Sequence, residues 1–212
     1  MIQSHKVSVP DIGAAVARHS YCSPARLLVQ ARQAREEGRA FKPLLLGPLS
    51  ALWLDAPQDA HGDGLQLLED LLPVYLQLVW QLAQLGVTWV QMDEPVLGIE
   101  LPGAWVLAFE RAYHAIAATR VSVLLSSHFV PAQGNLSVAC KLPVAGLHID
   151  QLRSTGELVG VRDWLPRHKA LSVDSVGDDV RQCDLDAALY GRAPLPWCDH
   201  VAHGQASSQL RT

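Results

Sequence analysis

The 212-residue chain lacks the features that mark membrane, nucleic-acid-binding and disulfide-stabilised proteins. Charged residues or proline interrupt every apolar stretch before about 18 residues, so we expect no membrane-spanning helix. Residues 1–11 lack the apolar core of a signal peptide. No basic run is interleaved with aromatic residues, and a net charge of −4 argues against nucleic-acid or anionic-membrane partners. The four cysteines form no Cys-x-x-Cys pair, which is typical of free thiols in a cytoplasmic protein.

The chain also lacks the usual fingerprints of cofactor sites. Neither Gly-x-Gly-x-x-Gly nor Gly-x-x-x-x-Gly-Lys-Ser/Thr occurs, so no nucleotide-binding motif is present. Metal-ligand residue types come together only at Cys198-Asp199-His200 and His203, in an unpatterned tail without a second ligand pair. A zinc site usually needs four ligands, or three and a water molecule. The sequence therefore predicts no cofactor and no metal site in this chain.

What the chain does contain is an alternation of short apolar runs and helical patterns. Five apolar runs read as buried strands: a run that ends at Gly47-Pro48, and residues 87–92, 121–125, 144–149 and 170–173. Helices are expected at 25–37, 65–85, 102–118, 135–142, 154–165 and 180–190. Such alternation favours a parallel sheet with right-handed crossovers. Because a closed (β/α)₈ barrel needs eight strands, we predict an α/β fold that is a partial barrel of about five parallel strands.

This pattern divides the chain into three parts. Residues 1–24 are poorly patterned, residues 25–190 form the partial barrel, and residues 191–212 form a loose tail. Ser23 and Pro24 have the residue types of an N-cap and first helical position, and Gly38 is suited to stop that helix. Gly47-Pro48 is expected to lead from the first strand into a loop. Pro73 should kink the 65–85 helix or mark the start of its long arm.

Polar side chains follow the predicted strands, at the point where each strand ends. The candidates for catalysis are Asp93, Glu94, His128, Asp150 and Asp174. The carboxyl ends of parallel strands meet on one side of a sheet, where α/β enzymes build their sites. Clustered carboxylates raise one another's pKa, as general acid–base catalysis requires. The alternative is that strand ends are simply where polar residues become allowed again. His148, inside the fourth run, reads as a hydrogen-bonded core histidine.

Several of these stretches resemble the N-terminal domain of cobalamin-independent methionine synthase. The segment that centres on Asp93-Glu94-Pro95 carries the resemblance most strongly. The order and spacing of the other matching segments agree with it, over roughly residues 25–190. The matching segments are residues 42–48, 52–54, 71–75, 86–97, 100–102, 104–105 and 142–150.

The resemblance implies methyl transfer from a 5-methyltetrahydrofolate polyglutamate to homocysteine, by two face-to-face (β/α)₈ barrels. In that family the C-terminal barrel holds zinc, which activates the homocysteine thiol, whereas the N-terminal barrel supports the architecture and the folate tail. This chain matches only part of the N-terminal barrel. His128 replaces the family's usual tyrosine, and Ser172–Ser175 replace a glycine-rich strand end. Asp93 corresponds by duplication to a homocysteine-binding carboxylate of the other barrel, a role that is not expected to persist here.

Three functions are compatible with these observations. The chain is expected to be catalytically incompetent alone, either as a fragment or as half of a split enzyme whose partner chain carries the missing barrel. Folate and homocysteine would then be ligands only of the full-length family. Alternatively, open sheet edges would make it a binding or assembly module. The third possibility is an independent small enzyme that uses the carboxylate face with His128.

Overall fold

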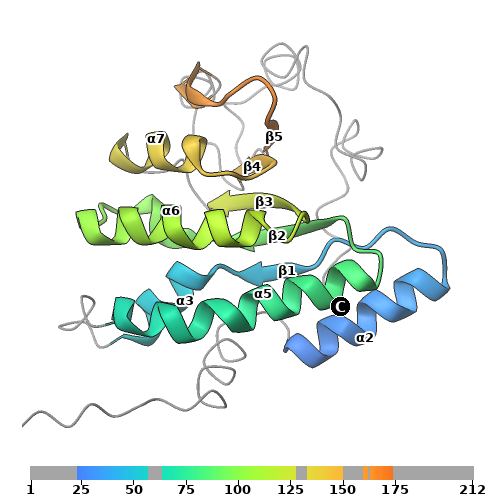
Figure 1. The fold of residues 1–212 in the computed structure, drawn as a ribbon. Helices are drawn as coiled ribbons and strands as arrows, with labels where there is room; N and C mark the ends of the chain where they lie inside the picture. Colours follow the sequence, from blue (N-terminus) through green and yellow to red (C-terminus); the bar gives the residue numbers. More distant parts are fainter. Residues whose placement is uncertain (1–22, 57–63, 128–132, 150–159, 162, 174–212) are drawn as a thin grey trace, which may run out of the picture.

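The computed structural model describes residues 23–56, 64–127, 133–149, 160, 161 and 163–173. Its strands form one sheet in sequential order, and every neighbouring pair is parallel (Figure 1). This arrangement confirms the predicted α/β fold with five parallel strands, and it is consistent with a partial barrel. The strands are β1 (Leu44–Leu46), β2 (Trp89–Asp93), β3 (Ser122–Ser127), β4 (Gly146–Ile149) and β5 (Ala170–Val173).

Helices connect the strands and cover one face of the sheet. Right-handed crossovers between sequential parallel strands place every connecting helix on the same face. In Figure 1, α5, α6 and α7 lie side by side in front of the sheet, in the order of the strands. The α-helices are α2 (Pro24–Glu36), α3 (Pro48–Asp55), α5 (Leu68–Gln84), α6 (Gly103–Ala117) and α7 (Gln133–Lys141), and the 3₁₀ helices are η1 (Leu65–Leu67) and η2 (Pro95–Gly98).

The two faces of the sheet differ in chemistry. Strand residues at alternate positions point to opposite faces. On the helix-covered face most of them are aliphatic or methionine and belong to the main hydrophobic core, and complete burial of each such side chain contributes about 1.5–3 kcal/mol. These core residues are Leu45, Val90, Met92, Val123, Leu125, Leu147, Ile149 and Leu171. The opposite face, which would line the interior of a barrel, carries most of the polar strand residues.

The predicted ends of the first helix are confirmed. The Ser23 hydroxyl accepts a hydrogen bond from the Arg26 backbone N–H at 3.4 Å, and Pro24 occupies the first turn of α2. Gly38 follows the helix with φ of +64°, a left-handed conformation that costs glycine little.

Two other expectations need correction. The loop predicted after Gly47 is wrong, because α3 begins directly at Pro48, where a proline ring is already set for the first helical turn. Of the two alternatives for Pro73, the start of the long arm is wrong, because α5 begins at Leu68 and runs through the proline. Buried Leu71, Leu72 and Tyr75 hold this part of α5 against the core, while Pro73 itself is exposed. The helix predicted at 180–190, most of that at 154–165, nearly all of the 1–24 segment and the 191–212 tail lie outside the described residues.

Candidate functional site

A row of polar side chains crosses the interior face of the sheet near the carboxyl ends of its strands. Asp93 pairs in register with Ser126, Ser126 with His148, and His148 with Ser172. Residues paired across neighbouring strands point to the same face. We call these four residues the polar row. It brings a carboxylate, an imidazole and two hydroxyls together on the face opposite the connecting helices.

Hydrogen bonds connect the polar row internally and to the adjacent layer of the same face. His148 Nδ1 lies 2.8 Å from Ser172 Oγ, so this histidine is hydrogen-bonded as expected, but it is half-buried on the interior face and does not belong to the main hydrophobic core. Gln91 Nε2 donates to Asp93 Oδ1 at 2.9 Å, and Lys42 Nζ donates to Gln91 Oε1 at 2.6 Å. Asp93 is thus a buried carboxylate supplied with an amide donor that is itself polarised by an ammonium group.

Glu94 follows Asp93 directly but points to the helix-covered side. Its Oε2 accepts the Ser50 backbone N–H at 2.7 Å, and its Oε1 accepts the Leu49 N–H at 3.3 Å and the Tyr113 hydroxyl at 3.0 Å. The first N–H groups of a helix have no partner within the helix. Glu94 therefore serves as the N-terminal cap of α3 from a distant part of the chain.

Gly47 leaves the space that this cap requires. It is the N-cap residue of α3 and offers no side-chain hydrogen bond of its own. A Cβ atom at position 47 would lie 2.1 Å from Glu94 Cδ. The glycine and the glutamate are therefore complementary, because the carboxylate of Glu94 occupies the place of a side chain at position 47.

Burial controls the protonation of Glu94. The side chain is completely buried, and loss of hydration raises its pKa to about 7, against the opposing effect of hydrogen bonds from Ser50, Tyr113 and Leu49. Burial also raises the pKa of the Tyr113 hydroxyl well above its usual value, and the nearby Glu94 carboxylate raises it further. The Tyr75 hydroxyl donates to the Leu46 carbonyl at 2.6 Å. Burial and the nearby Glu94 carboxylate raise its pKa as well.

The structure places two of the five predicted site residues, and it separates them. Asp93 belongs to the polar row, whereas Glu94 caps α3. The remaining candidates, His128, Asp150 and Asp174, lie outside the described residues.

Sequence reasoning missed several residues that complete these two environments. Gln91 and Ser172 belong to the interior face. Gln91 lies two residues before Asp93, and Ser172 alternates with the apolar Leu171 and Val173. The two-residue period of a strand could therefore have placed both side chains on the polar face. Tyr113 is one of the buried residues of α6. No local signal indicates that its hydroxyl meets Glu94.

The described residues offer no ligand set for zinc. No three His, Cys, Asp or Glu side chains among them lie close enough together to hold a metal ion. Within the same part of the chain, no helix is both long and apolar enough to cross a membrane.

Comparison with known proteins agrees with the fold and the motifs. The family described as "Cobalamin-independent synthase, N-terminal domain" matches residues 7–192. The 5-methyltetrahydropteroyltriglutamate–homocysteine methyltransferase of Saccharophagus degradans is 40% identical over 188 residues, which make up 88% of this chain but 24% of that protein. The chain thus spans about a quarter of the length of the curated relative it matches. It belongs to the cobalamin-independent methionine synthase family and corresponds to that family's N-terminal domain.

Proposed function

We propose that this chain acts in methyl transfer to homocysteine as a supporting part of an N-terminal domain, and that it does not catalyse the reaction alone. The observation that carries the proposal is 40% identity to a homocysteine methyltransferase along 88% of the chain, combined with coverage of only 24% of that enzyme. The remaining three quarters of such an enzyme would have to supply the reaction centre.

The chemistry of the reaction supports this division. A homocysteine thiol is a weak nucleophile near neutral pH and must become a thiolate before it attacks a methyl group. In the family, zinc supplies this activation from the C-terminal barrel. The described residues of this chain contain no ligand set for such a metal. The polar row would then have a supporting role, in which Lys42 and Gln91 hold Asp93 in a fixed position on the interior face.

Purified chain, mixed with homocysteine, 5-methyltetrahydropteroyltriglutamate and zinc, is expected to form no methionine above the rate of the mixture without protein. Added to the Saccharophagus degradans enzyme from which the matching quarter has been deleted, it is expected to raise methionine formation. A Leu45→Asp variant, which places a charge at a position with 0% exposure, serves as the unfolded control and should not raise it. Methionine formation by the chain alone would refute the proposal.

A second candidate, an assembly module, is favoured by the edges of the sheet. Within the described part of the chain, β1 pairs only with β2, and β5 pairs only with β4. An edge strand presents unpaired N–H and C=O groups that can pair with another chain. We therefore expect concentration-dependent association in sedimentation velocity experiments. A single species of monomer mass at all concentrations would count against this candidate. It would not affect the methyl-transfer proposal, which is tested by methionine formation.

A further inference from the structure

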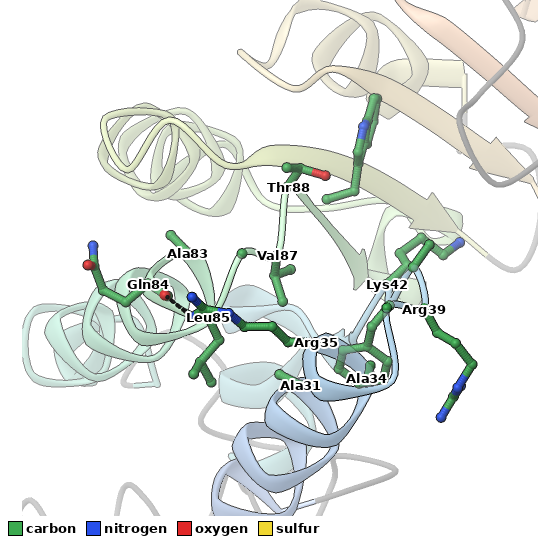
Figure 2. A pocket seen from close by; sticks show the side chains of 15 residues that line it. Ala31, Ala34, Arg35, Arg39, Lys42, Ala83, Gln84, Leu85, Val87 and Thr88 are labelled. Atoms are coloured by element: carbon green, nitrogen blue, oxygen red, sulfur yellow. Dashed lines mark hydrogen bonds between the residues drawn. The ribbon is translucent and has the colours of Figure 1, made fainter.

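A cavity of about 470 Å³ lies at the opposite end of the strands from the polar row (Figure 2). It is bounded by the C-terminal parts of α2 and α5 and by the two segments that enter β1 and β2, residues 38–42 and 85–89. Its size is in the range of sites for small organic molecules. The family relationship and the proposed function assign nothing to it.

All the charged side chains that line the cavity are basic. Arg35, Arg39 and Lys42 line it, and no Asp or Glu does. Glu37 neutralises one of the three, because it forms an ion pair with Arg39. The C-terminal ends of α2 and α5 border the cavity and contribute about half a negative charge each. Lys42 Nζ donates to Gln91 Oε1 at 2.6 Å and is thus directed to the interior face. The cavity therefore has no excess charge for a polyanion, and a single carboxylate would have to pair with Arg35.

Arg35 is the residue best placed to bind such a group. Its side chain reaches from α2 to the end of α5, where Nη1 donates to the Gln84 carbonyl at 3.3 Å (Figure 2). This is the single hydrogen bond of the Arg35 side chain within the described part of the chain. A guanidinium carries five N–H groups in a planar fork that matches a carboxylate. Most of its donors therefore remain for a ligand.

The walls of the cavity are apolar and suit a hydrophobic body. Ala31 and Ala34 of α2 are buried, and their small side chains leave the space open. Val87 is buried on the opposite side, while Phe41 and Trp89 are half-buried at the entrances to the two strands. An aromatic or branched aliphatic group placed here would remove apolar surface from water on both sides.

We propose that this cavity binds a small organic monocarboxylate with an aromatic or aliphatic body. Arg35 pairs with the carboxylate, and the alanine-lined face of α2 together with Val87 and Trp89 receives the body.

Calorimetric titration of the chain with 2-naphthoate is expected to show one saturable site with a Kd of about 0.1–1 mM. The neutral isostere 2-naphthamide and the body-less acetate should each bind at least about tenfold more weakly, since each lacks one half of the recognition. Binding of 2-naphthamide equal to that of 2-naphthoate, or no saturation below about 10 mM, would overturn the proposal.

Matched variants separate a specific site from general attraction to a basic surface. Arg35→Gln should weaken binding about fivefold, the effect expected of one partly solvated ion pair. Arg32→Gln, the same change at an exposed position of α2 outside the cavity, should leave it unaltered. Equal effects of the two changes would overturn the proposal. Arg35→Gln also removes the hydrogen bond to α5, so a second pair of variants tests the site without that change. Thr88 lines the cavity, and Thr88→Asp should weaken binding whereas the uncharged Thr88→Asn should not. Equal affinities of these two variants for 2-naphthoate would contradict the site.

Discussion

Replacement of Gly47 by alanine is expected to destabilise the folded chain by about 3 kcal/mol, at the upper end of the usual cost of overpacking. Backbone strain is not the reason, because φ of −70° at this position suits any residue. The reason is the 2.1 Å approach of the new Cβ to Glu94 Cδ. Glu94 cannot move aside freely, since it is buried and bonded to Leu49, Ser50 and Tyr113. Urea denaturation followed by tryptophan fluorescence measures the loss.

The double variant with Glu94→Ala tests the cause. Glu94→Ala alone leaves the Leu49 and Ser50 N–H groups and the Tyr113 hydroxyl without their acceptor, at about 1–3 kcal/mol for each group that stays dry. With that side chain removed, Gly47→Ala should cost much less, so the two changes should be coupled by about 2 kcal/mol. Gly103→Ala, at the first residue of α6 with open space around it, should change stability by less than about 0.5 kcal/mol. A cost at Gly47 no larger than at Gly103 would contradict the explanation.

This cap also shows why part of the fold could be predicted from the sequence and part could not. The strands lie in mostly apolar runs, and α2 carries its own signals at Ser23 and Gly38, so local patterns were sufficient for both. The start of α3 has no local cap, because its acceptor, Glu94, stands 47 residues after Gly47. Only the pairing of β1 with β2 brings them together, and no local pattern contains that pairing.

The candidate site divides in the same way. The prediction that polar residues gather at strand ends depends on parallel pairing. Within the described residues this pairing places Asp93 in one row with Ser126 and His148, neither of which was among the predicted site residues. The different orientation of Asp93 and Glu94 follows from the alternation of side chains along a strand, which was available from the sequence. What it could not show is the interaction that each carboxylate makes, because Tyr113 and Ser50 meet Glu94 through packing of α6 and α3.

The stability of the chain is expected to fall as pH rises from about 5 to about 8, with Glu94 contributing on the order of 2–3 kcal/mol of the change. The folded-state pKa of Glu94, about 7, lies above its ordinary value of 4.5. Between these values the folded state binds more protons than the unfolded state, so folding is favoured by acid. The stabilisation is complete below about pH 4.5 and is lost as pH rises through about 7. Urea denaturation at several pH values measures the slope.

Glu94→Gln isolates this effect from every other titrating group. Among the groups around the carboxylate, Tyr75 and Tyr113 stay protonated throughout this range, because burial raises both of their pKa values. Asp93 is the residue directly before Glu94 and is retained in the variant. Its contribution to the pH dependence of stability therefore cancels when the two proteins are compared. Glutamine has nearly the shape of protonated glutamic acid but cannot ionise, so the variant should lose the Glu94 part of the slope. A difference in the free energy of unfolding between the two proteins that stays constant with pH would contradict this. It would mean that Glu94 is ionised in the folded state throughout this range, because the N–H donors at the start of α3 outweigh the loss of hydration.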